Sequence, residues 1–300
     1  MFDATRKFLS AQFEIMVPLQ VQFATLILHF LWCYLFISVW GGREVGAAMA
    51  TNITYILNMI IVDIICLNKK SLKENKTHKL WPDAKSFANL CGYLKIGIPG
   101  ACMLCFEWWC FELLAIFSGL MSVEALAAEV IVVNLVTFIF MIPLGTGYAA
   151  SAFTGYFLGQ GKIDKAKKYS RLTIVFNIVI TAIVLILLGT LRTEISHLFT
   201  KETKTVAVVE DVMNILMLYI FFDTIHGVQS GIIRGLGLQV WGSIYTLICY
   251  YLVGLPLALW LAFVKGKGVY GLWLGFSIAC IVLDFGFLCI IECPNWGRIA

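Results

Sequence analysis

Residues 172–191 read LTIVFNIVITAIVLILLGTL, a stretch of twenty residues without a charged side chain. About 20 predominantly apolar residues in a helix are enough to cross the hydrocarbon core of a bilayer. The whole chain has this character, since 60% of its 300 residues are apolar, 13% are charged and the mean hydropathy is +0.89. A soluble domain has about 45–50% apolar and about 25% charged residues. The composition therefore excludes an ordinary soluble enzyme, a disordered chain and a nucleic-acid binder, and it predicts an all-α polytopic membrane protein.

Eight such stretches follow one another, with expected bounds of 16–40, 45–67, 91–118, 126–151, 172–191, 207–231, 241–264 and 269–291. Two connections, residues 68–90 and 156–171, are rich in lysine, and they fall on the same side if each span crosses once. Assigning that side to the cytoplasm places 15 Lys and Arg side chains inside and 6 outside. The positive-inside rule therefore predicts that both termini are cytoplasmic.

Two glycosylation sequons test this orientation. Asn52-Ile-Thr54 lies inside a span, and Asn75-Lys-Thr77 lies in the basic connection. We expect neither to be glycosylated, because glycan acceptors lie in surface loops of the non-cytoplasmic side.

The first and last helix pairs share a pattern. Trp40 is followed by Gly-Gly-Arg-Glu-Val-Gly-Ala at 41–47, and Trp260 is followed by Gly-Lys-Gly-Val-Tyr-Gly at 266–271, an offset of roughly 224 residues. This predicts a six-helix repeat. The expected organisation is two last helices of an N-terminal lobe (1–67), a basic cytoplasmic inter-lobe linker (68–90), a complete six-helix C-terminal lobe (91–292) and a short cytoplasmic tail (293–300).

Ionisable residues within the spans are the first candidates for function, because a carboxylate near the bilayer centre costs about 2.5–3.5 kcal/mol on insertion scales. Glu107 and Glu112 share one span but point about 140° apart, whereas Asp223 and His226 are three apart and share a face. An apolar environment favours a protonated carboxyl, and a nearby cation favours the ionised form. Glu107 and Asp223 are therefore predicted to line a polar cavity and to exchange protons with bound cations, while Glu112 stays open between that role and a structural one.

The other polar residues of the spans are expected to have local partners. They are Asp63, Glu129, Asp284 and His29, and Asp63 and Asp284 lie within a few residues of cytoplasmic helix ends, where water is within reach.

Proline and glycine interrupt several spans. Pro99, Pro143 and Pro256 each remove a backbone hydrogen bond and permit a bend, which is either a static kink or a hinge for alternating access. Gly231 and Gly235, one turn apart, are expected to allow close helix packing.

No enzyme motif is present in the sequence. Gly155-x-x-x-Gly159-x-Gly161 lacks the Lys-Ser/Thr of a phosphate-binding loop, and Cys102-x-x-Cys105 lies in an apolar span without a second ligand pair. We therefore expect a protein that is not an enzyme, without metal or cofactor, and driven by an ion gradient.

Several motifs, in the order in which they follow one another along the chain, resemble those of the eukaryotic multidrug and toxic compound extrusion (MATE) family. They are Gly97-Ile98-Pro99, Met103–Trp109 (MLCFEWW), Phe111-Glu112, Met141–Gly145 (MIPLG), Ala149-Ala150-Ser151, Gly159-Gln160-Gly161, Gly231–Gly237 (GIIRGLG) with Gln239, and Tyr250–Pro256 (YYLVGLP). The similarity starts near Phe8 and runs almost to the C-terminus.

The resemblance implies a twelve-helix, two-lobed secondary transporter that exports organic cations or other xenobiotics in exchange for H⁺ or Na⁺, with H⁺ usual in the eukaryotic branch. Its coupling acids fall on Glu107 and Asp223, and Glu112 matches a second acidic position. Asn134 stands where animal-type members often have another acid. With Trp108, these residues form the predicted set for coupling and substrate binding.

The match begins where the fifth family helix is expected, so the resemblance implies that the first four family helices have no counterpart in this sequence. Two hypotheses remain: an antiporter in the plasma or vacuolar membrane, or a truncated non-transporting membrane protein that is a remnant or a modulator of full-length relatives. An intramembrane enzyme would need a nucleophile or metal cluster, and a flippase for lipid-linked sugars would need a strongly cationic cavity, whereas Lys95 is the one basic residue predicted deep inside a span.

Overall fold

The computed structural model describes residues 2–12, 14–70, 88, 90–293 and 296, and all regular structure in that part of the chain is helical. Eight helices in it are long and apolar enough to cross a membrane: Met16–Val39, Arg43–Asn68, Leu90–Met121, Val123–Gly159, Ile163–Thr190, Thr203–Gly235, Gln239–Val264 and Gly268–Glu292. The predicted all-α membrane protein with eight spans is therefore confirmed. Seven of these eight helices are longer than predicted, because backbone hydrogen bonding continues beyond the apolar stretch, whereas Met16–Val39 ends one residue before its predicted end.

Two short helices were not predicted. They are α1 (Phe2–Ala11) and α8 (Arg192–Phe199), and both carry charged residues that hydropathy does not assign to a span. The chain divides into two units, residues 1–90 and 91–300.

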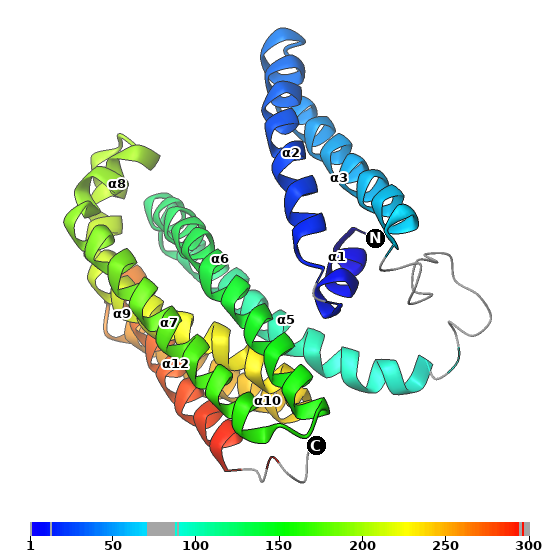
Figure 1. Cartoon of the computed structure of the whole chain (residues 1–300). Coiled ribbons are helices and arrows are strands. Elements are labelled where there is room, and N and C mark those ends of the chain that lie inside the picture. The colour runs from blue at the N-terminus through cyan, green and yellow to red at the C-terminus, as the bar shows by residue number, and fades with distance from the viewer. Residues whose placement is uncertain (1, 13, 71–87, 89, 294–295, 297–300) are drawn as a thin grey trace. The chain divides into compact units, whose positions relative to one another are not determined.

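Unit 1 contains α1, α2 (Met16–Cys33), the π-helical segment η1 (Tyr34–Val39) and α3 (Arg43–Asn68). Figure 1 shows α2 and α3 side by side. Polar side chains bridge them, because the Thr25 hydroxyl donates to Asn58 Oδ1 over 2.7 Å and His29 Nδ1 lies 2.9 Å from Thr54 Oγ1. His29 thus has the local partner that was expected.

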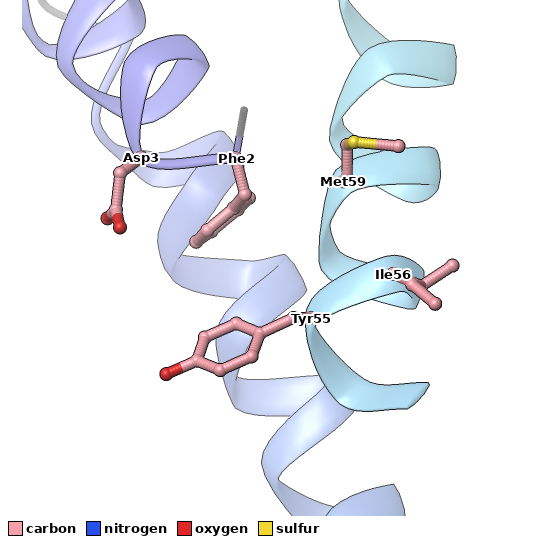
Figure 2. A pocket seen from close by; sticks show the side chains of 5 residues that line it. All are labelled: Phe2, Asp3, Tyr55, Ile56 and Met59. Atoms are coloured by element: carbon pink, nitrogen blue, oxygen red, sulfur yellow. The ribbon is translucent and has the colours of Figure 1, made fainter. Parts of the chain in front are cut away.

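A pocket of about 240 Å³ opens within unit 1 between α1 and α3. Figure 2 shows Phe2 and Asp3 at the start of α1, opposite Tyr55, Ile56 and Met59 along α3. Its one carboxylate already forms an ion pair with Arg6, at 2.8 Å. The pocket is therefore a mostly apolar hollow and offers little chemistry.

Unit 2 is built around α9 (Thr203–Gly235), which packs against α6 (Val123–Gly159), α7 (Ile163–Thr190) and α12 (Gly268–Glu292). Figure 1 shows α6 and α7 running along α9. Unit 2 also contains the long helix α5 (Leu90–Met121). Large side chains fill the interior, among them Trp273, Tyr219, Tyr250, Phe276 and Leu216.

Helices α6 and α9 cross with their backbones in contact. A Cβ on Gly147 would lie 2.5 Å from the carbonyl oxygen of Gly227, and a Cβ on Gly235 would lie 2.7 Å from that of Ser151. A Cβ on Gly231 would overlap the carbonyl of Gly147. Gly231 and Gly235 thus serve the close helix approach that their spacing predicts.

A polar seam joins the same helices to α7. Asn177 accepts a hydrogen bond from the Thr146 hydroxyl at 3.1 Å and donates to the backbone carbonyl of Thr224 at 2.8 Å. Thr181 and Thr224 bond to each other at 3.0 Å. In an apolar medium such bonds fix neighbouring helices against each other.

The span 239–264 changes helix type three times. It consists of α10 (Gln239–Leu247), η3 (Ile248–Gly254), α11 (Leu255–Leu259) and η4 (Trp260–Val264), where η marks a π-helical segment. Pro256 lies in the first turn of α11. Proline has no backbone N–H to give to the preceding turn, and the wider π-helical segment η3 ends at Gly254, two residues before Pro256.

The turns that follow η1 and η4 have the same geometry, 225 positions apart. Gly41 and Gly266 have φ of +64° and +66°, and α3 and α12 begin two residues later. The bond from Gly42 N to Phe36 O recurs between Lys267 N and Leu261 O. This offset agrees with the roughly 224 residues expected from the sequence pattern.

Candidate functional site

Glu107 and Asp223 line one pocket in unit 2. Glu107 comes from α5 and is 4% exposed, and Asp223 comes from α9 and is 2% exposed. The rest of the pocket is lined by Trp108, Phe111, Val136, Thr137 and Phe140. Its volume of about 10 Å³ has room for about one water molecule. The two acids selected from the sequence are thus brought together inside an apolar, aromatic wall.

Three side chains contact the two acids. The Tyr219 hydroxyl, one turn earlier on α9, donates to Asp223 Oδ1 over 2.9 Å, and the Tyr250 hydroxyl donates to Glu107 Oε1 over 3.5 Å. His226 Nε2 lies 3.5 Å from Glu107 Oε2. The spacing of four could have indicated Tyr219, whereas no local pattern points to Tyr250, which lies in the π-helical segment η3.

Glu107 and Phe140 also line a second pocket, of about 20 Å³, whose other polar residues are His226, Ser230 and Arg234. Glu107 therefore lies between a pocket that contains Asp223 and a pocket that contains a histidine and an arginine.

Asp284 does not fit the prediction that water reaches it at a helix end. It is 6% exposed, and neither of its carboxyl oxygens has a hydrogen-bond partner in the described part of the chain. The prediction was wrong because distance from a helix end does not say which neighbour covers a face, and α12 packs along α9.

Glu129 is fully buried on α6 and accepts a hydrogen bond from Trp273 Nε1 over 2.8 Å. The expected partner therefore exists, but it lies on α12, 144 residues further along the chain. The Trp273 ring lies 5.1 Å from that of Tyr219, so this bond adjoins the carboxyl pair.

Glu112 and Asn134 are exposed and do not line the pockets that contain Glu107. Asn134 donates to the Val130 carbonyl of its own helix at 2.7 Å. Glu112 lies on a different face of α5, as its angle from Glu107 predicts. Trp108 is 39% exposed and does line the pocket with the two acids.

The three prolines lie in different settings. Pro99 lies inside α5, and Pro143 is buried inside α6 and faces Gly227 of α9. Pro256 is not among the buried residues and lies just after η3. Their use as hinges stays a prediction.

The described residues contain no cluster of three or more His, Cys, Asp or Glu that could hold a metal ion. The cysteines, including Cys102 and Cys105, are free thiols. What the arrangement offers is a pair of enclosed carboxyls that can hold protons or a cation.

The MatE family model matches residues 99–260, more than half of the chain. Protein DETOXIFICATION 16 of Arabidopsis thaliana is 33% identical over 298 residues, which are 98% of this chain and 60% of that protein. Multidrug and toxin extrusion protein 1 of Danio rerio is 33% identical over 206 residues, 69% of this chain and 35% of that protein. The chain thus spans about a third to three fifths of the length of these relatives.

Among solved structures, the crystal structure of the eukaryotic MATE transporter AtDTX14 superposes with a TM-score of 0.94 at 27% identity, over 99% of this chain and 66% of that one. The Vibrio cholerae MATE transporter VcmN shares the fold alone, with a TM-score of 0.80 at 15% identity, over 99% of this chain and 66% of that one. The chain therefore belongs to the MatE family, and it is a multi-pass integral membrane protein with the fold of a MATE transporter.

Proposed function

We propose that this chain carries the coupling site of a secondary antiporter that exports organic cations or other xenobiotics in exchange for H⁺. The observation that carries the proposal is the shared pocket of Glu107 and Asp223, two enclosed carboxyls from different helices. The relatives named for multidrug and toxin extrusion support the same class of activity, and a transporter of this kind is not an enzyme.

The pocket suits an exchange of protons for cations. Two carboxylates close together in an apolar interior repel each other, so a proton or a cation is needed to hold them there. A cationic substrate that enters favours their ionised form, and its departure allows protons to return. The walls of Trp108, Phe111 and Phe140 offer aromatic faces to a cation.

The predicted residues then have unequal roles. Glu107 and Asp223 couple the proton, and Trp108 contacts the substrate beside them. Glu112 and Asn134 lie outside the pocket and would contact a substrate only from the exposed faces of α5 and α6. Pro99, Pro143 and Pro256 are the proposed hinges, and Na⁺ is the alternative coupling ion.

The orientation and organisation belong to the same proposal. Residues 91–292 form the six-helix C-terminal lobe, residues 1–67 the last two helices of the N-terminal lobe, 68–90 the linker and 293–300 the tail. The excess of Lys and Arg places both termini in the cytoplasm. The plasma membrane and the vacuolar membrane are the two host membranes proposed.

The alternative is a truncated membrane protein that does not transport by itself. The chain spans 60% or less of the length of the two curated relatives compared above. An isolated part of a two-lobed transporter would leave one wall of the central cavity incomplete.

The test is uptake of a fluorescent organic cation into proteoliposomes under a pH gradient. It is run on this chain and on a version extended by the four preceding helices of a relative. We expect Glu107→Gln and Asp223→Asn to abolish gradient-driven uptake. Glu292→Gln is the matched control, because this exposed acid pairs with Arg171 at 3.0 Å outside the pocket. Uptake that survives loss of both pocket acids refutes the proposal, and uptake by the extended version alone favours the alternative for this chain.

A further inference from the structure

The second pocket beside Glu107 has a polar stripe along one helix. His226, Ser230 and Arg234 follow at intervals of four on α9 and line the pocket together. Residues four apart lie on the same helix face. Ser230 Oγ lies 3.4 Å from His226 Nε2. The stripe therefore leads from the carboxyl of Glu107 to the guanidinium of Arg234 through two groups that can donate hydrogen bonds.

Arg234 brings a permanent positive charge to this pocket, because a guanidinium is not deprotonated in proteins. It lies over the ring of Tyr148, whose centroid is 5.7 Å from Arg234 Cζ. No carboxylate of the described residues forms an ion pair with it. The pocket is thus lined by both a carboxyl and a guanidinium, which form no ion pair with each other in the described structure.

A carboxylate or similar oxyanion matches the Arg234 end. A guanidinium recognises such a group through paired, charge-assisted hydrogen bonds, and the Ser230 hydroxyl adds a donor. The volume of about 20 Å³ suits one small polar group and not a whole drug-sized molecule.

We infer that Arg234 and Ser230 hold an anionic group of the substrate while Glu107 and Asp223 hold its cationic group, so that zwitterions are the preferred substrates. This inference rests on the proposed transport function and specifies its substrate class. The headgroup of an anionic lipid carries the same oxyanion chemistry, and the test separates the two sources.

The test measures equilibrium binding of rhodamine B and of rhodamine B ethyl ester to the full chain in phosphatidylcholine nanodiscs at neutral pH. The two dyes share one cationic ring system, and only rhodamine B has a free carboxylate. We expect Arg234→Gln to weaken binding of rhodamine B by about tenfold, the loss expected for a charge-assisted hydrogen bond. Binding of the ester stays within about twofold. Arg234→Lys keeps the charge but loses the fork geometry, so it gives an intermediate loss for rhodamine B alone.

Arg171→Gln is the matched control, because Arg171 is exposed and pairs with Glu292 outside the pocket. It leaves the binding of both dyes unchanged. Retained ester binding shows that the Arg234 variants are folded. Equal loss of both dyes in Arg234→Gln, or loss of neither, overturns the inference.

Two further arms separate the proposals. In one outcome, the wild-type chain binds the ester, Glu107→Gln abolishes that binding, and Arg234→Gln leaves rhodamine B binding unchanged. This outcome supports the proposed transport site and refutes the anionic subsite. If the wild type binds neither dye, both fall. In the lipid arm, part of the phosphatidylcholine is replaced with phosphatidylserine. If the subsite binds substrate, the affinity for rhodamine B stays unchanged. A marked loss of affinity assigns the site to lipid headgroups and overturns the inference.

Discussion

Replacing Gly147 by alanine tests whether the crossing of α6 and α9 holds unit 2 together. The added Cβ would lie 2.5 Å from the carbonyl oxygen of Gly227, whereas ordinary van der Waals contact begins at 3.4 Å. The two backbones must therefore move apart by about 0.9 Å, and a gap of about 0.5–1 Å already loses a quarter to a half of the attraction between the atoms involved. Overpacking costs about 1–3 kcal/mol, and we expect the upper part of that range because both contacting groups are backbone.

The assay is thermal unfolding in detergent, followed by the circular dichroism of the helices. For a unit of about 200 residues, this cost lowers the unfolding midpoint by roughly 4–12 °C. Gly145→Ala is the control, because a Cβ at Gly145 has no neighbour within 4 Å in the described structure, two residues away on the same helix. Alanine is favoured over glycine in a helix by up to about 1 kcal/mol, so this variant keeps or raises the midpoint.

The two variants thus move in opposite directions if the reasoning is right. An unfolding midpoint for Gly147→Ala equal to that of Gly145→Ala would mean that the backbones of α6 and α9 do not touch at this point. The glycine explanation of the crossing would then be wrong.

Three other predictions concern single residues. Trp273→Phe removes the donor to buried Glu129 and lowers the free energy of unfolding by about 1–3 kcal/mol, the cost of an unsatisfied buried polar group, measured by chemical denaturation. Asp284→Leu raises the free energy of unfolding by about 1–3 kcal/mol in the same assay, because it replaces a buried carboxyl that has no partner in the described residues. Asn75 remains unglycosylated when the chain is made in a glycosylating membrane system, which an electrophoretic shift after glycosidase treatment measures; this sequon lies outside the described residues.

Each of these predictions has its own control. Combining Trp273→Phe with Glu129→Leu removes both partners, so the double variant should lose less stability than the sum of the single changes; full additivity would show that the two side chains do not interact. For Asp284, a fall in stability would show that the carboxyl has a partner in the folded protein. A glycan on Asn75 would reverse the predicted orientation.

The eight spans could be predicted because apolar length alone identifies a membrane helix. Their ends could not, because hydropathy falls where a helix leaves the apolar core, while its backbone bonds continue, as in residues 163–171 of α7. The amphipathic α1 and α8 were missed for the same reason, since neither is apolar enough to count as a span.

Part of the candidate site could also be predicted from the sequence. A buried acid is expensive in a membrane, so Glu107 and Asp223 stood out by type and position, and the resemblance to a family selected the same pair. Tyr250 did not stand out, because a π-helical turn changes the direction in which a side chain points. Asp284 was misjudged because α12 packs against helices from distant parts of the chain, such as α9, and the position of a residue in its own helix does not reveal this.

The matching turns after η1 and η4 have a consequence for biogenesis. Each is closed by bonds between residues at most six positions apart, such as Gly42 N to Phe36 O and Lys267 N to Leu261 O. A helical hairpin whose turn is closed by such local hydrogen bonds can form its turn without contacts to distant parts of the chain. Each pair of helices is therefore able to enter the lipid as a preformed unit, independently of segments that the ribosome adds later.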